Sequence, residues 1–389
     1  MSAPQSRIRR FALLIFSVLL LFHQWTPPTY SAGIAQPEAQ RSAGQQRSVV
    51  TATGARTSTA DSQAVNALTS QLFFPAVDYG YNSSSGTWNS TIQVQNPSTS
   101  NSASVQISFY NSNGQVTTPT SLPAAGNSSL QNPFTLMPGA AATIRIDSQS
   151  NVPQLQNGRY AVVVSSDQPL TGVTWVRISG SGNESHDSYE GFTTAATAPV
   201  YLPTVAKAAN GTFTNNLAIQ NLTNSTLMGV TLSFYDQNGN PSGATNVPAP
   251  PIAAYAAWYP DLSLLSIPPN FIGSVVVSSP NGAIAVVDNK LVGTTLLSYN
   301  GITTGAQTLY APFLSTQFGS SATVTVQNIS NQVATVTFSH SDNNGSTQFN
   351  LPPRGSRVES YSAGSHSGPF AAIITANQPV IAVASVQNQ

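Results

Sequence analysis

The sequence contains no cysteine, which excludes disulfide bonds, thiolate metal sites and a lipid anchor on an N-terminal cysteine. Charge is also scarce, because only 7 % of the residues are charged and 13 basic residues balance 13 acidic ones. A chain without excess positive charge has no field to hold a polyanion, so we expect no nucleic-acid partner. Long amphipathic helices need charged outer faces, which this composition cannot supply.

Apolar residues are present in normal amount, at 40 % of the 389 residues. That share is enough to build buried cores, and the length predicts two or three domains. We expect no cofactor.

The N-terminus has the layout of a secretory signal peptide, which we assign to residues 1–35. Three arginines precede an apolar run over residues 11–22, and Pro27-Pro28 and small residues follow. A run of twelve residues is too short to span a bilayer, for which about 20 are needed. We therefore expect a secreted, extracellular protein, retained on the cell surface or released, with no membrane span after cleavage. The alternative is an uncleaved membrane anchor.

Residues 36–71 are rich in Ser, Gln, Ala and Thr, and they predict a flexible linker. A short helix over residues 61–72 is an alternative for its end. Beyond the linker, short alternating runs are separated by Gly, Pro, Asn and Ser, which is an all-β pattern.

One series of signals occurs three times in this β region. Each copy has a Pro-containing opening, a strand that ends in Gln-Asn, an alternating strand that ends in Phe, and an Asn-Gly turn. The copies of the Gln-Asn pair are Gln95-Asn96, Gln220-Asn221 and Gln327-Asn328. Later in each copy a glycine begins a β-branched strand, and a turn and a last apolar strand follow; in the third copy we place that turn at residues 376–380.

The copies define three repeats: the first at residues 72–182, the second at 199–305 and the third at 306–389. Residues 183–198 are predicted to be an interdomain linker. Units of this size with several short strands fit two-sheet sandwiches. We therefore predict an all-β fold of three tandem antiparallel β-sandwich domains.

The order of these signals resembles the immunoglobulin-like and fibronectin type III-like modules of secreted bacterial surface proteins. The resemblance covers residues 72–389, and its motifs are short and structural. It implies tandem β-sandwiches at the cell exterior and carries no catalytic residue to this chain. The Cys…Trp…Cys pattern of antibody domains is absent.

Two polar clusters are candidates for chemistry. Asp236, Asn238 and Asn240 have the alternating oxygen ligands of a calcium loop, but Pro241 stands where a glycine is expected, so a plain hairpin turn is favoured. The segment Glu184–Glu190 contains Ser185, His186 and Asp187 and suggests a hydrolase triad or a glycosidase acid pair. Contiguous residues in a predicted linker lack the scaffold that catalysis needs, so we assign no catalytic residue.

Other residues receive brief assignments. Adjacent Asn289 and Lys290 cannot form an inter-strand isopeptide bond with each other. We expect His340 and His366 to be exposed polar residues, and Trp175 and Trp258 to be core or interdomain residues.

The aromatic residues Tyr79, Tyr81 and Trp88 lie near the start of the first repeat beside Asn and Ser residues. Sugar-binding sites stack aromatic faces on sugar rings and bind the hydroxyls with amides, so these residues are candidate glycan contacts. The alternative is that they close one end of a sandwich.

These observations predict a non-catalytic structural or adhesive protein of the bacterial cell surface or extracellular matrix. Its expected partners are cell-surface polysaccharide or other surface proteins, and exposed edge strands would permit self-association. The first alternative is a carbohydrate-binding protein for neutral glycans. The second is an extracellular hydrolase with an unrecognised site.

Overall fold

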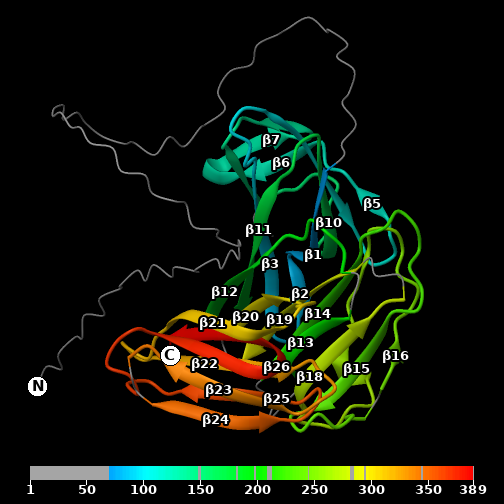
Figure 1. The fold of residues 1–389 in the computed structure, drawn as a ribbon. Helices are drawn as coiled ribbons and strands as arrows, with labels where there is room; N and C mark the ends of the chain where they lie inside the picture. Colours follow the sequence, from blue (N-terminus) through cyan, green and yellow to red (C-terminus); the bar gives the residue numbers. More distant parts are fainter. Residues whose placement is uncertain are drawn as a thin grey trace, which may run out of the picture. The chain divides into compact units, whose positions relative to one another are not determined.

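The computed structural model describes residues 70–388, with gaps at 148–149, 181–182, 197–198, 208–212, 244, 281–283, 293–294 and 343–344 (Figure 1). All described residues belong to one compact unit, Asn66–Gln389. The predicted signal peptide, the predicted linker up to residue 69, Asn344 and the side chain of Lys290 lie outside the described residues.

The strands up to residue 190 are β1 (Ser70–Tyr79), β2 (Tyr81–Ser83), β3 (Gly86–Gln95), β4 (Ala103–Tyr110), β5 (Val116–Thr117), β6 (Ser121–Ala124), β7 (Ser128–Gln131), β8 (Phe134–Leu136), β9 (Ala141–Ile146), β10 (Gly158–Ser166), β11 (Thr171–Gly180) and β12 (Asn183–Glu190). The next group is β13 (Val200–Ala206), β14 (Phe213–Asn221), β15 (Thr231–Asp236), β16 (Val247–Pro248), β17 (Ala257–Trp258), β18 (Ile272–Ser278), β19 (Ile284–Val292) and β20 (Thr295–Asn300). The last group is β21 (Ala306–Leu314), β22 (Ser320–Asn328), β23 (Ala334–His340), β24 (Ser346–Leu351), β25 (Ser356–Tyr361) and β26 (Phe370–Asn388).

The only helical segments among the described residues are two 3₁₀ turns, η1 (Ala125–Asn127) and η3 (Leu262–Leu264). In the part of the chain that the structure describes, no helix has the length and apolar character to cross a membrane.

The strands form five sheets, and all pairs are antiparallel. Sheet 1 has the order β1-β10-β4-β5 with β8 beside β4, and sheet 2 has the order β12-β11-β3-β9-β6-β7 with β2 beside β3. Sheet 3 is β13-β18-β15-β16, and sheet 4 is β17-β14-β19-β20. Sheet 5 is β24-β23-β26-β22-β25 with β21 beside β26. The prediction of an all-β antiparallel fold is confirmed.

Where apolar and polar residues alternate in the sequence, the strand has one buried face and one more exposed face. In β4, Val105, Ile107 and Phe109 are buried while their neighbours are partly exposed. Three large hydrophobic clusters result. The first gathers Phe74 of sheet 1 with Trp88 of sheet 2; the second contains Phe234, and the third Phe338. Burial of these apolar side chains supplies most of the folding free energy.

The repetition seen in the sequence is also a repetition of structure. The carboxamides of Asn96, Asn221 and Asn328 each donate hydrogen bonds to three backbone carbonyls, two of which belong to consecutive residues. These hydrogen bonds satisfy a buried carboxamide, which would be costly to leave unpaired, and they hold the loop against the end of the strand in each repeat. Of the predicted Asn-Gly turns, Gly114, Gly239 and Gly345 have φ near +80°, the conformation in which glycine carries no steric penalty.

Three segments differ from expectation. Residues 70–71, predicted as the end of the linker or of a short helix, begin strand β1. Residues 183–190 are strand β12, paired with β11 along its whole length, so the predicted linker 183–198 begins as part of sheet 2. The last predicted turn, at residues 376–380, is absent because β26 continues through it and changes partners there, from β23 at Ala376 to β22 at Val380.

Candidate functional site

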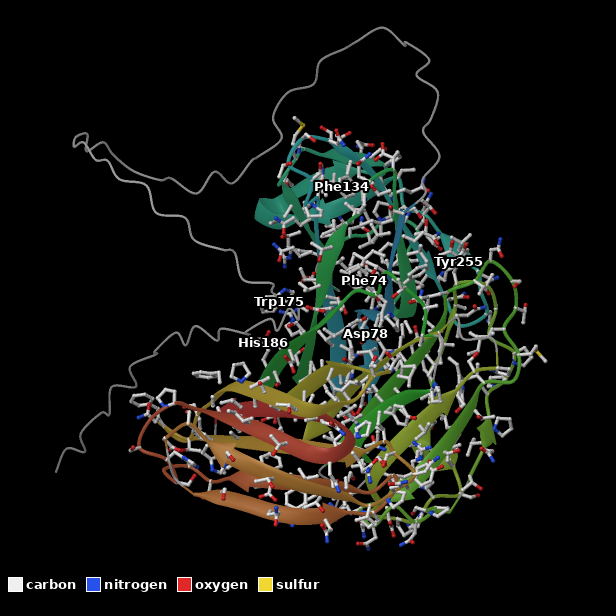
Figure 2. All side chains as sticks on the ribbon, in the orientation of Figure 1. Phe74, Asp78, Phe134, Trp175, His186 and Tyr255 are labelled. Carbon is white, nitrogen blue, oxygen red and sulfur yellow. The ribbon has the colours of Figure 1, made fainter. Side chains whose placement is uncertain are left out.

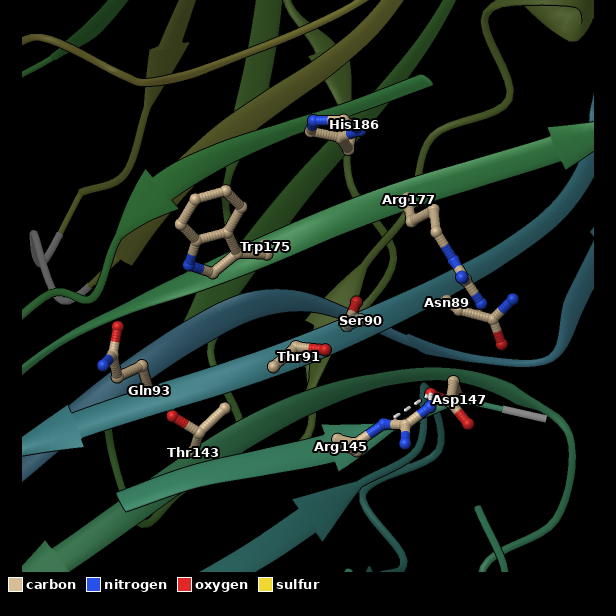
Figure 3. A pocket seen from close by; sticks show the side chains of 10 residues that line it. All are labelled: Asn89, Ser90, Thr91, Gln93, Thr143, Arg145, Asp147, Trp175, Arg177 and His186. Carbon is tan, nitrogen blue, oxygen red and sulfur yellow. Dashed lines mark hydrogen bonds and ion pairs between the residues drawn. The ribbon is translucent and has the colours of Figure 1, made fainter. Parts of the chain in front are cut away.

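A groove of about 430 Å³ crosses the outer face of sheet 2 (Figure 3). Strand β3 supplies Asn89, Ser90, Thr91 and Gln93, β9 supplies Thr143 and Arg145, β11 supplies Trp175 and Arg177, and β12 supplies His186; Asp147 follows β9. We call this feature the Trp175 groove.

Strand register sets the arrangement of the Trp175 groove. Thr91 lies opposite Arg145 on one side and Trp175 on the other, and Arg177 lies opposite both Asn89 and His186. Side chains two apart on one strand share a face, so these residues form adjacent rows across the sheet. Their neighbours Ile92 and Val176 point to the other side and are fully buried in the first cluster.

Trp175 provides the apolar surface of the groove and is 38 % exposed. It lies near His186 at the margin of the strands, with Phe74 and Asp78 further inside (Figure 2). Hydroxyl, carboxamide, guanidinium and imidazole groups surround the indole. Such a surface can stack on a flat ring while neighbouring polar groups bind its hydroxyls.

Each of the two arginines that line the groove has a carboxylate partner. Arg145 Nη2 lies 2.9 Å from Asp147 Oδ2, and Arg177 Nη1 lies 3.2 Å from Glu184 Oε1. Burial raises the pKa of Asp147, but hydrogen bonds from Arg145 and Ser150 and the arginine charge outweigh it and hold the pKa below its ordinary value. The carboxylate therefore stays ionised at neutral pH and neutralises Arg145.

The prediction for Trp175 was a core or interdomain position, and the structure places it on an outer sheet face instead. The sequence carried the signal, because Thr174, Val176 and Ile178 alternate with Trp175 and Arg177. The first three are buried. On a strand with one buried face, a tryptophan two residues from an arginine shares the arginine's face, which is the solvent-facing one.

The predicted glycan residues lie elsewhere and two of them are buried. Trp88 is fully buried and its indole N–H donates to Ser83 Oγ at 2.9 Å; Tyr79 is 7 % exposed and its hydroxyl donates to the Ser150 carbonyl. The Tyr81 ring is covered by the Arg159 guanidinium at 4.3 Å. Because these aromatic rings are buried or covered by Arg159, they do not form an open stacking surface.

The candidate calcium ligands form a hairpin turn. Asp236 Oδ1 accepts the backbone N–H groups of Asn238 and Asn240 at 2.9 and 2.8 Å, and its Oδ2 accepts the Asn240 side chain. Asn111 makes the same two backbone contacts in the first repeat without any carboxylate. Among the described residues, no group of three or more His, Asp or Glu side chains could hold a metal ion.

The cluster Glu184–Glu190 is divided between the two faces of β12. Ser185 Oγ and Asp187 Oδ2 accept backbone N–H groups of Leu296 and Ser298 on β20, at 2.8 and 2.7 Å. His186 points to the opposite face and lines the Trp175 groove. Alternation along the strand therefore separates the serine and the aspartate from the histidine, and no triad is assembled.

The two histidines of the third repeat are not simple exposed residues. His366 is buried, its Nδ1 lies 2.6 Å from Asp342 Oδ2, and its ring stacks on Phe370. His340 Nε2 lies 3.0 Å from the Tyr361 hydroxyl. Trp258, by contrast, packs against the second hydrophobic cluster, which confirms a structural position for it.

Comparisons with known proteins add little to this geometry. No family model matches the chain, and no curated protein matches it. One similar solved structure is that of Thermotoga maritima 1070, which is 11 % identical; the match covers 32 % of this chain and 94 % of that chain, with a TM-score of 0.23. At that TM-score the likeness carries no argument about fold or function.

Proposed function

We propose that this chain is a secreted, non-catalytic adhesive protein of the bacterial cell surface or extracellular matrix, and that it binds a neutral glycan in the Trp175 groove. Three tandem β-sandwiches would form its scaffold, each built around one of the three large hydrophobic clusters. The observation that carries the proposal is the half-exposed Trp175 on a polar sheet face.

The second repeat supports this proposal because it uses the same sheet face differently. Aligning the Gln-Asn pairs makes Gln93 equivalent to Ala218 and, through the strand registers, His186 equivalent to Leu296. Ala218 and Leu296 are buried, and both belong to the hydrophobic cluster of the first repeat. The same face of the second repeat is therefore covered, with apolar side chains beside the fully buried Asn289 at the position of Trp175, whereas in the first repeat the indole stays exposed and available to a ligand.

The paired charges favour a ligand without net charge. Each arginine of the groove already has a carboxylate partner, so an anionic ligand would have to displace Asp147 or Glu184. A neutral sugar needs only hydrogen bonds to its hydroxyls and an apolar face for its ring.

The experiment is co-sedimentation of the purified protein with insoluble neutral polysaccharides. We expect saturable binding that persists at high salt and is competed by a soluble sugar. Trp175→Ala should weaken it about tenfold or more, equivalent to about 1.4 kcal/mol. Phe318→Ala is the matched control, because Phe318 is 94 % exposed and lies in the third repeat. Equal retention of wild type and Trp175→Ala would contradict the proposal.

A protein-assembling surface component without sugar binding is the second candidate. The exposed apolar surface of the third repeat, Tyr310 and Ile373 at 55 % and 42 % exposure, favours it. Binding to the producer's envelopes that no soluble sugar competes would support this candidate over the first.

A further inference from the structure

Consecutive repeats meet through two junctions that have the same construction. At the first junction, Tyr255 of the second repeat lies against Phe73 and Tyr110 of the first, with ring centroids 6.4 and 5.4 Å apart. At the second junction, Arg354 of the third repeat lies over the Tyr201 ring at 5.6 Å and donates to its hydroxyl.

The residues at these junctions are structurally equivalent. Phe73 pairs with Val163 as Tyr201 pairs with Val276. Tyr255 and Arg354 occupy the same loop position, two residues after a carbonyl that accepts the Asn221 or Asn328 carboxamide, and their φ angles are 60° and 65°. The Asn-Gly turn also recurs: Gly114 approaches Ala253, and Gly239 approaches the Pro353 carbonyl. One mode of docking is thus used twice within the chain.

Each end of this series has an uncovered counterpart. In the third repeat, Tyr310 pairs with Ile373 as Phe73 pairs with Val163. Tyr310 and Ile373 are 55 % and 42 % exposed, whereas the four residues at the equivalent junction positions are 2–8 % exposed. Gly345, which corresponds to Gly114, has no described atom within 4 Å of the Cβ that it lacks. We call this surface the tail face.

The loop at the other end is uncovered in the first repeat. Gly139 is equivalent to Tyr255 and Arg354, has φ +71°, and has no described atom within 4 Å of its missing Cβ. Met137, in the position of Ala253 and Pro352, is 60 % exposed. In the manner of Ala253 against Gly114, Met137 would lie against the turn at Gly345. We call this loop the head loop.

We propose that a second copy of this chain docks its head loop on the tail face, so that molecules associate head to tail in the manner of the two internal junctions. The tail face and the head loop are different surfaces, so this contact is heterologous and each copy keeps one free end. Depending on the rotation between copies, such a contact gives rings or filaments. The proposal is independent of the Trp175 groove, which contributes no residue to it.

Sedimentation velocity of the full chain over a range of concentrations tests the proposal. We expect the average mass to rise with concentration above the monomer value. Tyr310→Asp and Met137→Asp should each return the protein to monomer. The controls are Phe318→Asp and Met228→Asp; Met228 is 60 % exposed, like Met137, and should leave association unchanged.

Mixing the two defective variants distinguishes head-to-tail association from other modes of association. The Tyr310→Asp protein keeps a head loop and the Met137→Asp protein keeps a tail face, so their mixture should form a one-to-one dimer and nothing larger. A wild-type protein that stays monomeric overturns the proposal. Association that tolerates Met137→Asp also overturns it, because that result indicates tail-to-tail or edge-strand contact. If the Tyr310→Asp monomer still binds sugar, glycan binding does not depend on self-association, and the two proposals can fail independently.

Discussion

The two internal junctions share a docking mode but differ in the residues at one pair of positions. The first encloses a charge pair: Arg159 Nε lies 2.7 Å from Asp78 Oδ1, and their side chains are 8 % and 0 % exposed. At the same register position the second repeat has Ala206, which is buried, and Ile272, which is 39 % exposed. The repeat therefore tolerates either an ion pair or an apolar pair here, and the neighbouring residues decide which one is stable.

Aromatic and polar groups from both repeats make the ion pair tenable. The Arg159 guanidinium lies 4.3 Å from the Tyr81 ring centroid and 5.3 Å from that of Tyr259, and it donates to Asn216. Burial lowers the pKa of Arg159, but the charge and hydrogen bond of Asp78 outweigh that effect and raise it. These partners offset part of the desolvation cost of the pair, although Asp78 Oδ2 and Arg159 Nη2 have no hydrogen-bond partner among the described residues; a single buried charge without its counter-ion is more costly still.

The largest expected effect comes from removing one member of this pair. Asp78→Ala leaves a buried guanidinium without its counter-ion and should lower the free energy of unfolding by about 3–5 kcal/mol. The double variant Asp78→Ala/Arg159→Ile installs the residues of the second repeat and should recover most of that loss. Chemical denaturation followed by tryptophan fluorescence measures both. A double variant no more stable than Asp78→Ala would show that the junction depends on the charges themselves.

Much of the scaffold was predictable from local pattern. The alternation of Val105, Ile107 and Phe109 specifies a strand with one buried face, and Gly114 and Gly239 follow asparagine where the backbone turns. These features depend on neighbours in the sequence, so the sequence alone reveals them.

The site was less predictable, because it depends on which face another repeat covers. Trp88 is fully buried, whereas Trp175 lies in the groove. Alternation along each strand separates them, because Trp88 shares its face with Ile92 and Trp175 shares its face with Arg177, but it does not show which exposed face stays uncovered. Similarly, the polar residues of β12 resemble a linker until pairing with β11 and contact with β20 account for them.

The second prediction concerns the pH dependence of stability, which we expect at the first junction and not at the second. Burial raises the pKa of Asp187 to about 6, although N–H donors from Ser298 and Ser188 oppose the shift. An acid whose pKa is raised on folding takes up a proton as the chain folds. Its stabilising contribution is therefore complete below about pH 4, near the unfolded pKa, and is lost as the pH rises through 6.

Asp187→Asn removes this penalty, since the amide oxygen still accepts the Ser298 N–H. The side chain keeps some exposure, which screens the charge, so we expect the variant to exceed wild type by about 1–2 kcal/mol at pH 8 and to match it near pH 4. Denaturation curves at both pH values measure this. Glu184→Gln, on the opposite face of the same strand, is the control; a pH-independent difference for Asp187→Asn would contradict the assignment.

The last prediction tests the second junction, through a difference of a few tenths of a kcal/mol between two variants. Arg354 donates to the Tyr201 hydroxyl and to the Ile329 carbonyl at 3.2 and 2.7 Å, and its φ is +65°. Arg354→Ala loses these contacts and keeps the unfavourable left-handed backbone, so it should cost about 1–2 kcal/mol. Arg354→Gly installs the residue found at position 139 and relieves the backbone, which should return part of that loss.

The pair of variants separates two roles of one position. If the glycine variant is the more stable of the two by a few tenths of a kcal/mol or more in thermal or chemical unfolding, the backbone conformation is set by the loop and the side chain supplies the contact between repeats. Equal destabilisation would mean that the side chain itself holds the loop in its left-handed turn. In that case Gly139 could not present the head loop in the same shape, and the head-to-tail contact would lose its structural precedent.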